Sequence, residues 1–163
     1  NDFPEWKFDQ KLKAWKTAGT IDGKKITLLR PDTFMNNSGI TLKGLALNLK
    51  QIESVLVAYD DMDLGLGTLK ISFNRGSGGH NGLASIIKAA KTEKFARFRF
   101  GVSPTNAKGV AKKPSGEDKV LKFILSAPKP DDRKILIKTF KTAMEALGVF
   151  ANDGLQKAMT DFN

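Results

Sequence analysis

The amino-acid sequence predicts an α/β fold: a single domain in which a mixed β-sheet is flanked by helices and followed by a C-terminal helical segment. Three features predict it. An Asp-Gly pair at residues 22–23 lies between two stretches suited to strands, which indicates a β-hairpin. The valine-rich run from Ser54 to Tyr59 is typical of a strand covered by helices on both faces. Pro130, followed by two aspartates, begins a long helical stretch, so strands and helices alternate along the chain.

The antiparallel part of the sheet is expected between Lys11 and Leu29, because the Asp-Gly turn supplies the positive φ angles of a tight hairpin. Pro31 is expected to end the second strand. Ser38 is then suited to cap a helix. The apolar residues of that helix recur on one face, and they are Leu42, Leu45, Ala46 and Leu49.

The middle of the chain predicts further strands and a helix. The buried strand from Ser54 is expected to end abruptly at Asp60. Residues 67–73 predict another strand, and a glycine-rich stretch leads from it into a helix through residues 83–90. In the strand from Phe95 to Val102, Arg97 and Arg99 alternate with phenylalanines, which predicts one apolar and one cationic face.

The last third of the chain begins with a loop and ends in helix. Residues 103–117 are rich in glycine, proline and lysine, which predicts a flexible basic loop. The helix that starts at Pro130 is expected to end near Gly148. Its predicted apolar face contains Leu136, Phe140, Met144 and Leu147. With 163 residues and no internal repeat, we expect residues 1–163 to form one domain.

The charge balance indicates a polyanionic partner. The chain has 27 Lys and Arg against 17 Asp and Glu, a formal net charge of +10. Such a surface attracts phosphate backbones, so nucleic acid is the favoured partner and an anionic membrane surface the alternative. A basic domain without either partner is also open. The sequence has no cysteine and no long apolar run, which excludes disulfide chemistry and favours a cytoplasmic protein without a membrane span.

Three polar segments are expected at the rim of the sheet, where open α/β sheets place their functional crevice. The first contains Asn36 and Asn37, between a strand and a helix. A positioned amide can donate to a carbonyl oxygen and stabilise an oxyanion. The same residues also shape turns and cap helices, so both interpretations stay open.

The second segment follows the buried strand and contains Asp60, Asp61 and Asp63. A carboxylate at a strand end can orient an imidazole and stabilise its protonated form. Three neighbouring carboxylates also suit Mg²⁺, although the chain has no further acidic cluster to complete such a site. Solvated turn acids are the third interpretation.

The third segment is the glycine-rich stretch of residues 76–82, which contains His80 and Asn81. It lacks the closing Lys-Ser or Lys-Thr of a Walker loop and the spacing of a dinucleotide fingerprint. His80 is the single histidine of the chain. On local grounds it is a candidate general base with Asp60 as its partner, or a structural histidine.

The three segments, in this order and at these separations, resemble the signature blocks of the bacterial peptidyl-tRNA hydrolase family. Residues 31–39 look like its proline, phenylalanine-methionine-asparagine and serine-glycine block. Residues 56–64 are similar to its strand with the catalytic aspartate, and residues 78–83 to its Gly-Gly-His-Asn-Gly-Leu block. With the arginine-containing strand and the helical end, the resemblance covers nearly the whole chain.

The resemblance implies a monomeric esterase without metal or cofactor, which frees tRNA from peptidyl-tRNA. By that likeness Asp60 is the catalytic aspartate and Asn36 a catalytic asparagine. The implied substrate-binding residues are Met35, His80 and Asn81, and the implied tRNA-binding residues are Lys70, Arg97 and Arg99. Ser72 stands where some relatives have a further lysine.

One departure from the family pattern bears on catalysis. Members carry a threonine-arginine-histidine-asparagine block with the catalytic base, and these 163 residues do not contain it. His80 matches the other family histidine, so we interpret it as a binding residue. We therefore expect an N-terminally incomplete chain that is inactive alone, with an opening segment in the intact protein. The alternatives are a non-catalytic RNA-binding relative and a Mg²⁺-dependent phosphoesterase.

Overall fold

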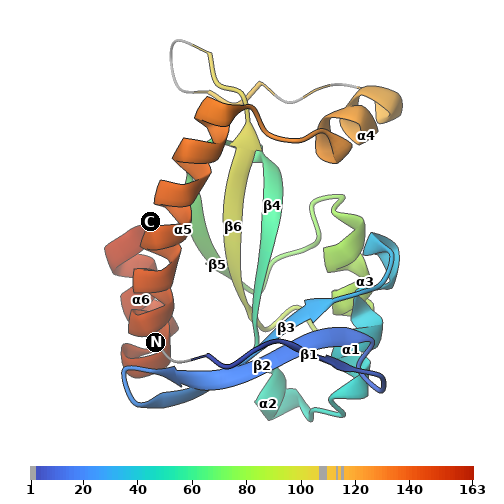
Figure 1. Ribbon diagram of the computed structural model, residues 1–163, viewed down its shortest axis with the longest axis vertical. Helices are drawn as coiled ribbons and strands as arrows, with labels where there is room; N and C mark the ends of the chain where they lie inside the picture. The colour runs from blue at the N-terminus through green and yellow to red at the C-terminus, as the bar shows by residue number, and fades with distance from the viewer. Residues whose placement is uncertain (1–2, 107–109, 113, 115) are drawn as a thin grey trace. The chain divides into compact units, whose positions relative to one another are not determined.

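The computed structural model describes residues 3–106, 110–112, 114 and 116–163, and its fold is mixed α/β (Figure 1). It contains two three-stranded sheets, in the orders β1-β2-β3 and β4-β6-β5. The α/β class with its mixed sheet and the helical C-terminal segment are confirmed. The expectation that the hairpin supplies the antiparallel part of that sheet is wrong, because the hairpin pairs with β1 and forms a sheet of its own.

The described chain divides into two compact units. Unit 1 comprises residues 1–56, 73–96 and 151–154, and unit 2 comprises residues 57–72, 97–150 and 155–163. That all 163 residues act as one domain stays a prediction. No helix in the described part of the chain is long and apolar enough to span a bilayer.

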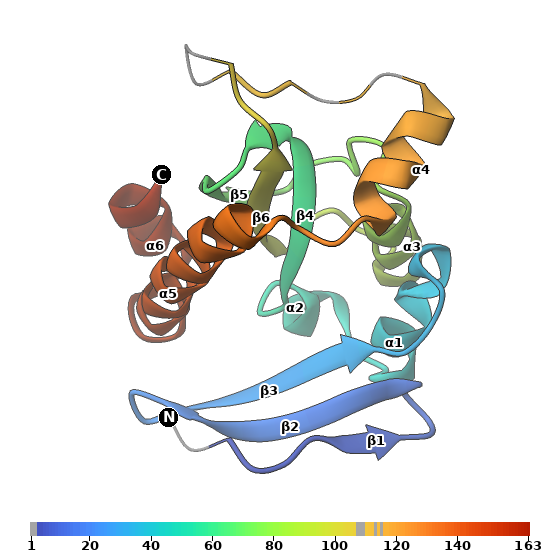
Figure 2. The same ribbon diagram turned by 45° about the horizontal axis from the view of Figure 1, so that its top comes forward.

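The sheet of unit 1 consists of β1 (Lys7–Asp9), β2 (Ala14–Ile21) and β3 (Lys24–Pro31), all antiparallel neighbours (Figure 2). The predicted turn is confirmed, since Asp22 and Gly23 have φ angles of 48° and 81°. β1 was not predicted, because three residues are too few to show a period of two. An edge-to-face contact between Phe8 and Trp15 pairs it with β2.

The first helical region of unit 1 differs from the prediction. The expected single helix is divided into α1 (Gly39–Gly44) and α2 (Leu49–Ile52), because Ala46 adopts a left-handed φ of 53°. Asn48 then starts α2 with a reciprocal capping box to Gln51. Leu49 is therefore exposed, although its spacing predicted burial.

The next helix of unit 1, α3, runs over Asn81–Ala90 and confirms the helix predicted after the glycine-rich stretch. The short helix η1 (Met35–Asn37) precedes α1. The N–H of Gly39 in α1 donates to Ser85 Oγ of α3 at 3.0 Å, so these helices pack closely. Ser38 makes no side-chain cap and instead donates to the carbonyl of Met35.

The sheet of unit 2 is mixed, with β6 (Ala96–Ser103) between β4 (Leu56–Gly65) and β5 (Leu69–Phe73). Hydrogen bonds join the segments entering β4 and β6, and others join their ends, so these strands run parallel. β5 is an edge strand. The Asn163 side chain accepts from the Ile71 N–H at 2.7 Å and donates to its carbonyl at 3.1 Å, which satisfies backbone groups at that edge.

The helices of unit 2 are α4 (Glu117–Leu125), α5 (Pro130–Asp153) and α6 (Leu155–Phe162). The predicted start of α5 is confirmed, but the helix continues through the buried Gly148. Its predicted apolar face is partly wrong, since Phe140 and Met144 are exposed while Thr139, Ala143 and Ala146 are buried. The predicted loop at 103–117 includes residues 107–109, 113 and 115, which lie outside the described residues.

Candidate active site

Unit 1 brings together four of the predicted site residues at η1 and the first turn of α3. Met35 and Asn36 belong to η1, which three residues separate from the end of β3. His80 is the N-cap of α3 and Asn81 is its first residue. The sequence placed these residues in two separate loops, and the fold makes the loops neighbours.

Gly82 is the reason that η1 can approach α3 so closely. A Cβ at this position would lie 2.5 Å from the Met35 sulfur and 3.0 Å from the His80 ring. The first distance is shorter than real contacts of a Cβ, so a larger residue would displace the Met35 side chain. The Met35 thioether and the imidazole therefore both lie close to the Gly82 backbone. This contact places Asn36 and Asn81, both exposed, at the same end of unit 1.

The His80 ring has a defined hydrogen-bonding state in this arrangement. Its Nδ1 accepts the N–H of Leu83 at 3.1 Å and caps the helix. A nitrogen that accepts has no proton, so the neutral ring carries its proton on Nε2. While His80 caps α3, its Nδ1 is not available to take a proton from water.

Unit 2 carries the three aspartates on β4, and here the structure corrects the prediction. The strand does not end at Asp60 but continues to Gly65. Because successive side chains of a strand point to opposite faces, Asp60 lies on one face and Asp61 and Asp63 on the other. Asp60 is half-buried. The predicted meeting of Asp60 with Asn36 and Asn81 joins residues of both units, and it stays a prediction.

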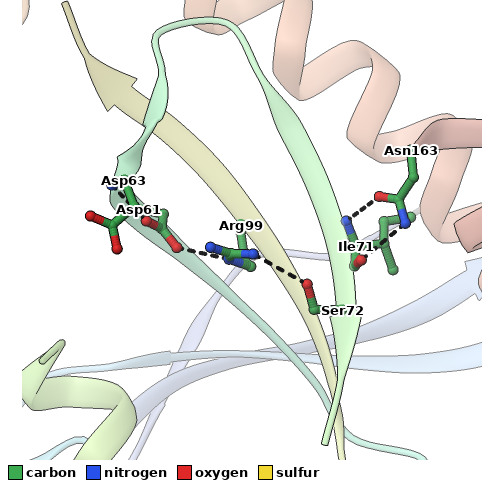
Figure 3. A network of polar contacts seen from close by, with 6 residues as sticks. All are labelled: Asp61, Asp63, Ile71, Ser72, Arg99 and Asn163. Atoms are coloured by element: carbon green, nitrogen blue, oxygen red, sulfur yellow. Dashed lines mark hydrogen bonds and ion pairs between the residues drawn. The ribbon is translucent and has the colours of Figure 1, made fainter. Parts of the chain in front are cut away.

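Asp61 belongs to a polar network that crosses the three strands of this sheet (Figure 3). Arg99 Nε on β6 donates to Asp61 Oδ2 at 2.8 Å, and the two side chains are 8% and 12% exposed. Arg99 Nη1 also donates to Ser72 Oγ on β5 at 3.5 Å. The other Asp61 oxygen accepts the N–H of Asp63 at 2.8 Å. The ion pair is thus largely removed from solvent.

The predicted strand with alternating arginines is confirmed, but its cationic face is not open to solvent. Four consecutive residues of β6, from Ala96 to Arg99, are buried, so both faces of the strand are covered. Arg97 has no exposed surface and Arg99 is 7% exposed. This burial argues against direct contact of either guanidinium with tRNA phosphates. Lys70, on the same face of β5 as Ser72, is half-buried and retains that predicted role.

Sequence reasoning missed the network between Asp61 and Arg99, although a signal was present. An arginine in a strand that is covered on both faces requires a buried partner. The acids of the neighbouring strand were the available partners. The search for a catalytic acid directed attention to Asp60, and Asp61 was considered only as a metal ligand or a turn residue.

The geometry gives no support to the Mg²⁺ interpretation of the three aspartates. Their alternation along β4 divides them between two faces, and Asp61 is engaged by Arg99. Across the described ranges, no group of three or more His, Asp or Glu side chains is arranged to hold a metal ion.

Comparison with known proteins gives consistent results. The family model described as peptidyl-tRNA hydrolase matches residues 3–163. The peptidyl-tRNA hydrolase of Herpetosiphon aurantiacus is 37% identical over 159 residues, which are 96% of this chain and 73% of the relative. That of Thermotoga maritima is 34% identical over 160 residues, 98% of this chain and 80% of the relative. The crystal structure of the Acinetobacter baumannii enzyme superposes with a TM-score of 0.84 at 25% identity, covering 98% of this chain and 76% of that one.

Proposed function

We propose, because this chain belongs to the peptidyl-tRNA hydrolase family, that the intact protein hydrolyses the ester bond between a peptide and its tRNA. The observation that carries the proposal is the approach of η1 to the first turn of α3, which brings Met35 and His80 together at Gly82, beside Asn81. The amide and imidazole groups of this region are suited to hold an ester carbonyl by hydrogen bonds.

The chemistry follows from the proposed roles. Water attacks the carbonyl carbon, the bond from that carbon to the tRNA hydroxyl oxygen breaks, and the released oxygen takes up a proton. A general base removes the proton from water, and Asp60 orients that base and stabilises its protonated form. Asn36, Asn81 and His80 donate hydrogen bonds to the substrate and to the negative charge that develops on the carbonyl oxygen.

The family resemblance assigns the base to a histidine in a block that these residues do not contain. Their single histidine, His80, caps α3 through Nδ1. We therefore expect a polypeptide of these 163 residues alone to release little or no peptide from tRNA. Release at the rate of the intact protein would contradict this expectation, and a purified 163-residue polypeptide assayed beside it provides the measurement.

The remaining expectations belong to the same proposal. The protein acts as a monomer in the cytoplasm, as a single domain, without a metal or other cofactor. Lys70 contacts the tRNA backbone. A chelator is expected to leave hydrolysis unchanged, since the proposed roles use amide, imidazole and carboxylate groups alone.

The direct test measures release of labelled peptide from peptidyl-tRNA by the intact protein. Asp60→Ala is expected to lower the rate by at least about a hundredfold, the usual size of a lost acid-base group. Asp63→Ala, an exposed aspartate on the same strand, is the matched control and should keep the rate within about twofold. Undiminished release by Asp60→Ala would refute the assignment.

A non-catalytic RNA-binding relative is the second candidate. The net charge of +10 favours it. The same experiment separates the two, because a binding protein retains tRNA without releasing peptide.

A further inference from the structure

The exposed positive charge of unit 1 gathers on its antiparallel sheet. Residues 7–31 contain seven cations and two carboxylates, a net charge of +5, which is half of the +10 of the whole chain. All seven cations are exposed. They are Lys7, Lys11, Lys13, Lys16, Lys24, Lys25 and Arg30.

Three of these lysines lie on one face of the sheet. Lys7 on β1 is directly opposite Lys16 on β2, and Lys25 on β3 is directly opposite Thr20, four residues further along β2. Side chains two or four residues apart in a strand share a face, so Lys7, Lys16 and Lys25 point the same way. We call this surface, with the exposed Ala18, Thr20 and Thr27 between the lysines, the lysine face. The opposite face contains the buried Thr17 and Ile21.

Repulsion between the lysines of this face lowers the stability of the free protein. Like charges directly opposite on neighbouring strands repel, and Lys7 and Lys16 are such a pair. Asp9 shares the face at one end, where its carboxylate accepts the N–H of Leu12. Among the described residues, no carboxylate forms an ion pair with the three lysines. A bound polyanion would remove the repulsion.

The side chains between the lysines distinguish between polyanions. A protein that lies on a membrane inserts large apolar side chains among the lipids. The lysine face instead has exposed alanine and threonine between its charges, and its leucine, Leu29 opposite Lys16, is half-buried. The aromatic residues Phe8 and Trp15 belong to the other face. A face of exposed lysines and hydroxyl groups is suited to a phosphate backbone, which lysine contacts as a point charge.

We propose that the lysine face binds the phosphate backbone of the RNA substrate. The proposal rests on the proposed function for the identity of that RNA. β3, which carries Lys25, ends at Pro31, and η1 with Met35 and Asn36 follows within the same unit. The sheet therefore binds the phosphate backbone of the RNA, and the segment that follows β3 supplies Met35 and Asn36, which bind near the ester.

The test compares two triple variants of the intact protein for binding of deacylated tRNA between about 50 and 300 mM salt. Lys7→Gln, Lys16→Gln and Lys25→Gln together remove the lysine face. Lys50→Gln, Lys88→Gln and Lys94→Gln together remove three exposed cations of the same unit outside that sheet. The first variant should bind about tenfold or more weakly at low salt, and its log-log salt slope should be shallower by about two to three. The control should change both quantities much less.

Several results would overturn the proposal. One is unchanged tRNA binding by the first variant. Another is an equal loss of tRNA binding in both variants, which would indicate that net charge, and not this face, determines the affinity. Loss of binding to vesicles of phosphatidylserine and phosphatidylcholine, with tRNA binding intact, would identify a membrane surface instead. Thermal unfolding of both variants checks that they fold. The hydrolase proposal fails separately, because a protein that binds tRNA through this face and releases no peptide would refute the enzyme alone.

Discussion

The basic residues of the two sheets differ in their exposure to solvent. In β1-β2-β3 the lysines are exposed and lie on an open face, whereas in β4-β6-β5 the arginines of the central strand are buried and Arg99 is paired with Asp61. Both β2 and β6 are central strands, yet Lys16 on β2 is exposed and Arg99 on β6 is buried. The difference teaches that the covering of a sheet face, not the presence of a cation in a strand, determines whether that cation can meet a ligand.

The largest expected effect is on stability, and it tests the buried side of the comparison. Asp61→Ala leaves the Arg99 guanidinium without its carboxylate in a site with 8% exposure. Breaking such a pair costs about 3 kcal/mol of unfolding free energy, measured by urea denaturation. Glu145→Ala, which removes an exposed carboxylate of α5 in the same unit, should cost less than about 0.5 kcal/mol.

A double variant distinguishes the attraction between Asp61 and Arg99 from the cost of leaving one of these charges buried without its partner. Replacing both partners with apolar residues, Asp61→Leu with Arg99→Met, removes the uncompensated charge and should be less destabilising than Asp61→Ala alone. If the double variant is the more unstable of the two, the ion pair itself supplies the stability, and our account of the network is wrong.

The smallest expected effect tests the exposed side. Lys16→Thr removes the repulsion from Lys7 and should raise the unfolding free energy by a few tenths of a kcal/mol at low salt. The gain should shrink as salt screens the charges. Lys25→Thr is the control, because its directly opposite residue is Thr20 and no like charge is relieved. Equal salt dependence in both variants would show that the opposed lysines do not repel.

The sequence was sufficient wherever a local rule decides the structure. The Asp-Gly turn, the strands on either side of it, the start of α5 at Pro130 and the helix after the glycine-rich stretch were all predicted. Turn and cap chemistry acts between residues that are close in sequence, so it can be seen without the fold. The same is true of the segments that carry Met35, Asn36, His80 and Asn81.

One error had a local cause. The apolar spacing from Leu42 to Leu49 predicted one helix, although Asn48 and Gln51 have the spacing of a capping box, which starts α2 after the left-handed Ala46. The other errors came from interactions between distant residues. The extension of β4 beyond Asp60 depends on pairing with β6. The burial of Arg97 depends on the covering of both faces of β6. Neither of these two facts can be read from a single segment.

The candidate site shows the same division. Sequence reasoning identified the residues of η1 and α3, but not the close approach that Gly82 permits between the Met35 sulfur and the His80 ring. Nor did it predict which imidazole nitrogen carries the proton. The hydrogen bond from Leu83 determines that, and it changes the chemistry that His80 can perform.

The most direct test of the central claim is the single-turnover rate of peptidyl-tRNA hydrolysis by the intact protein, measured with protein in excess for Asp60→Asn. We expect the rate to fall by at least about a hundredfold while the affinity for tRNA stays within about twofold, because an amide keeps the shape of the side chain but not its charge. An unchanged rate would contradict the account.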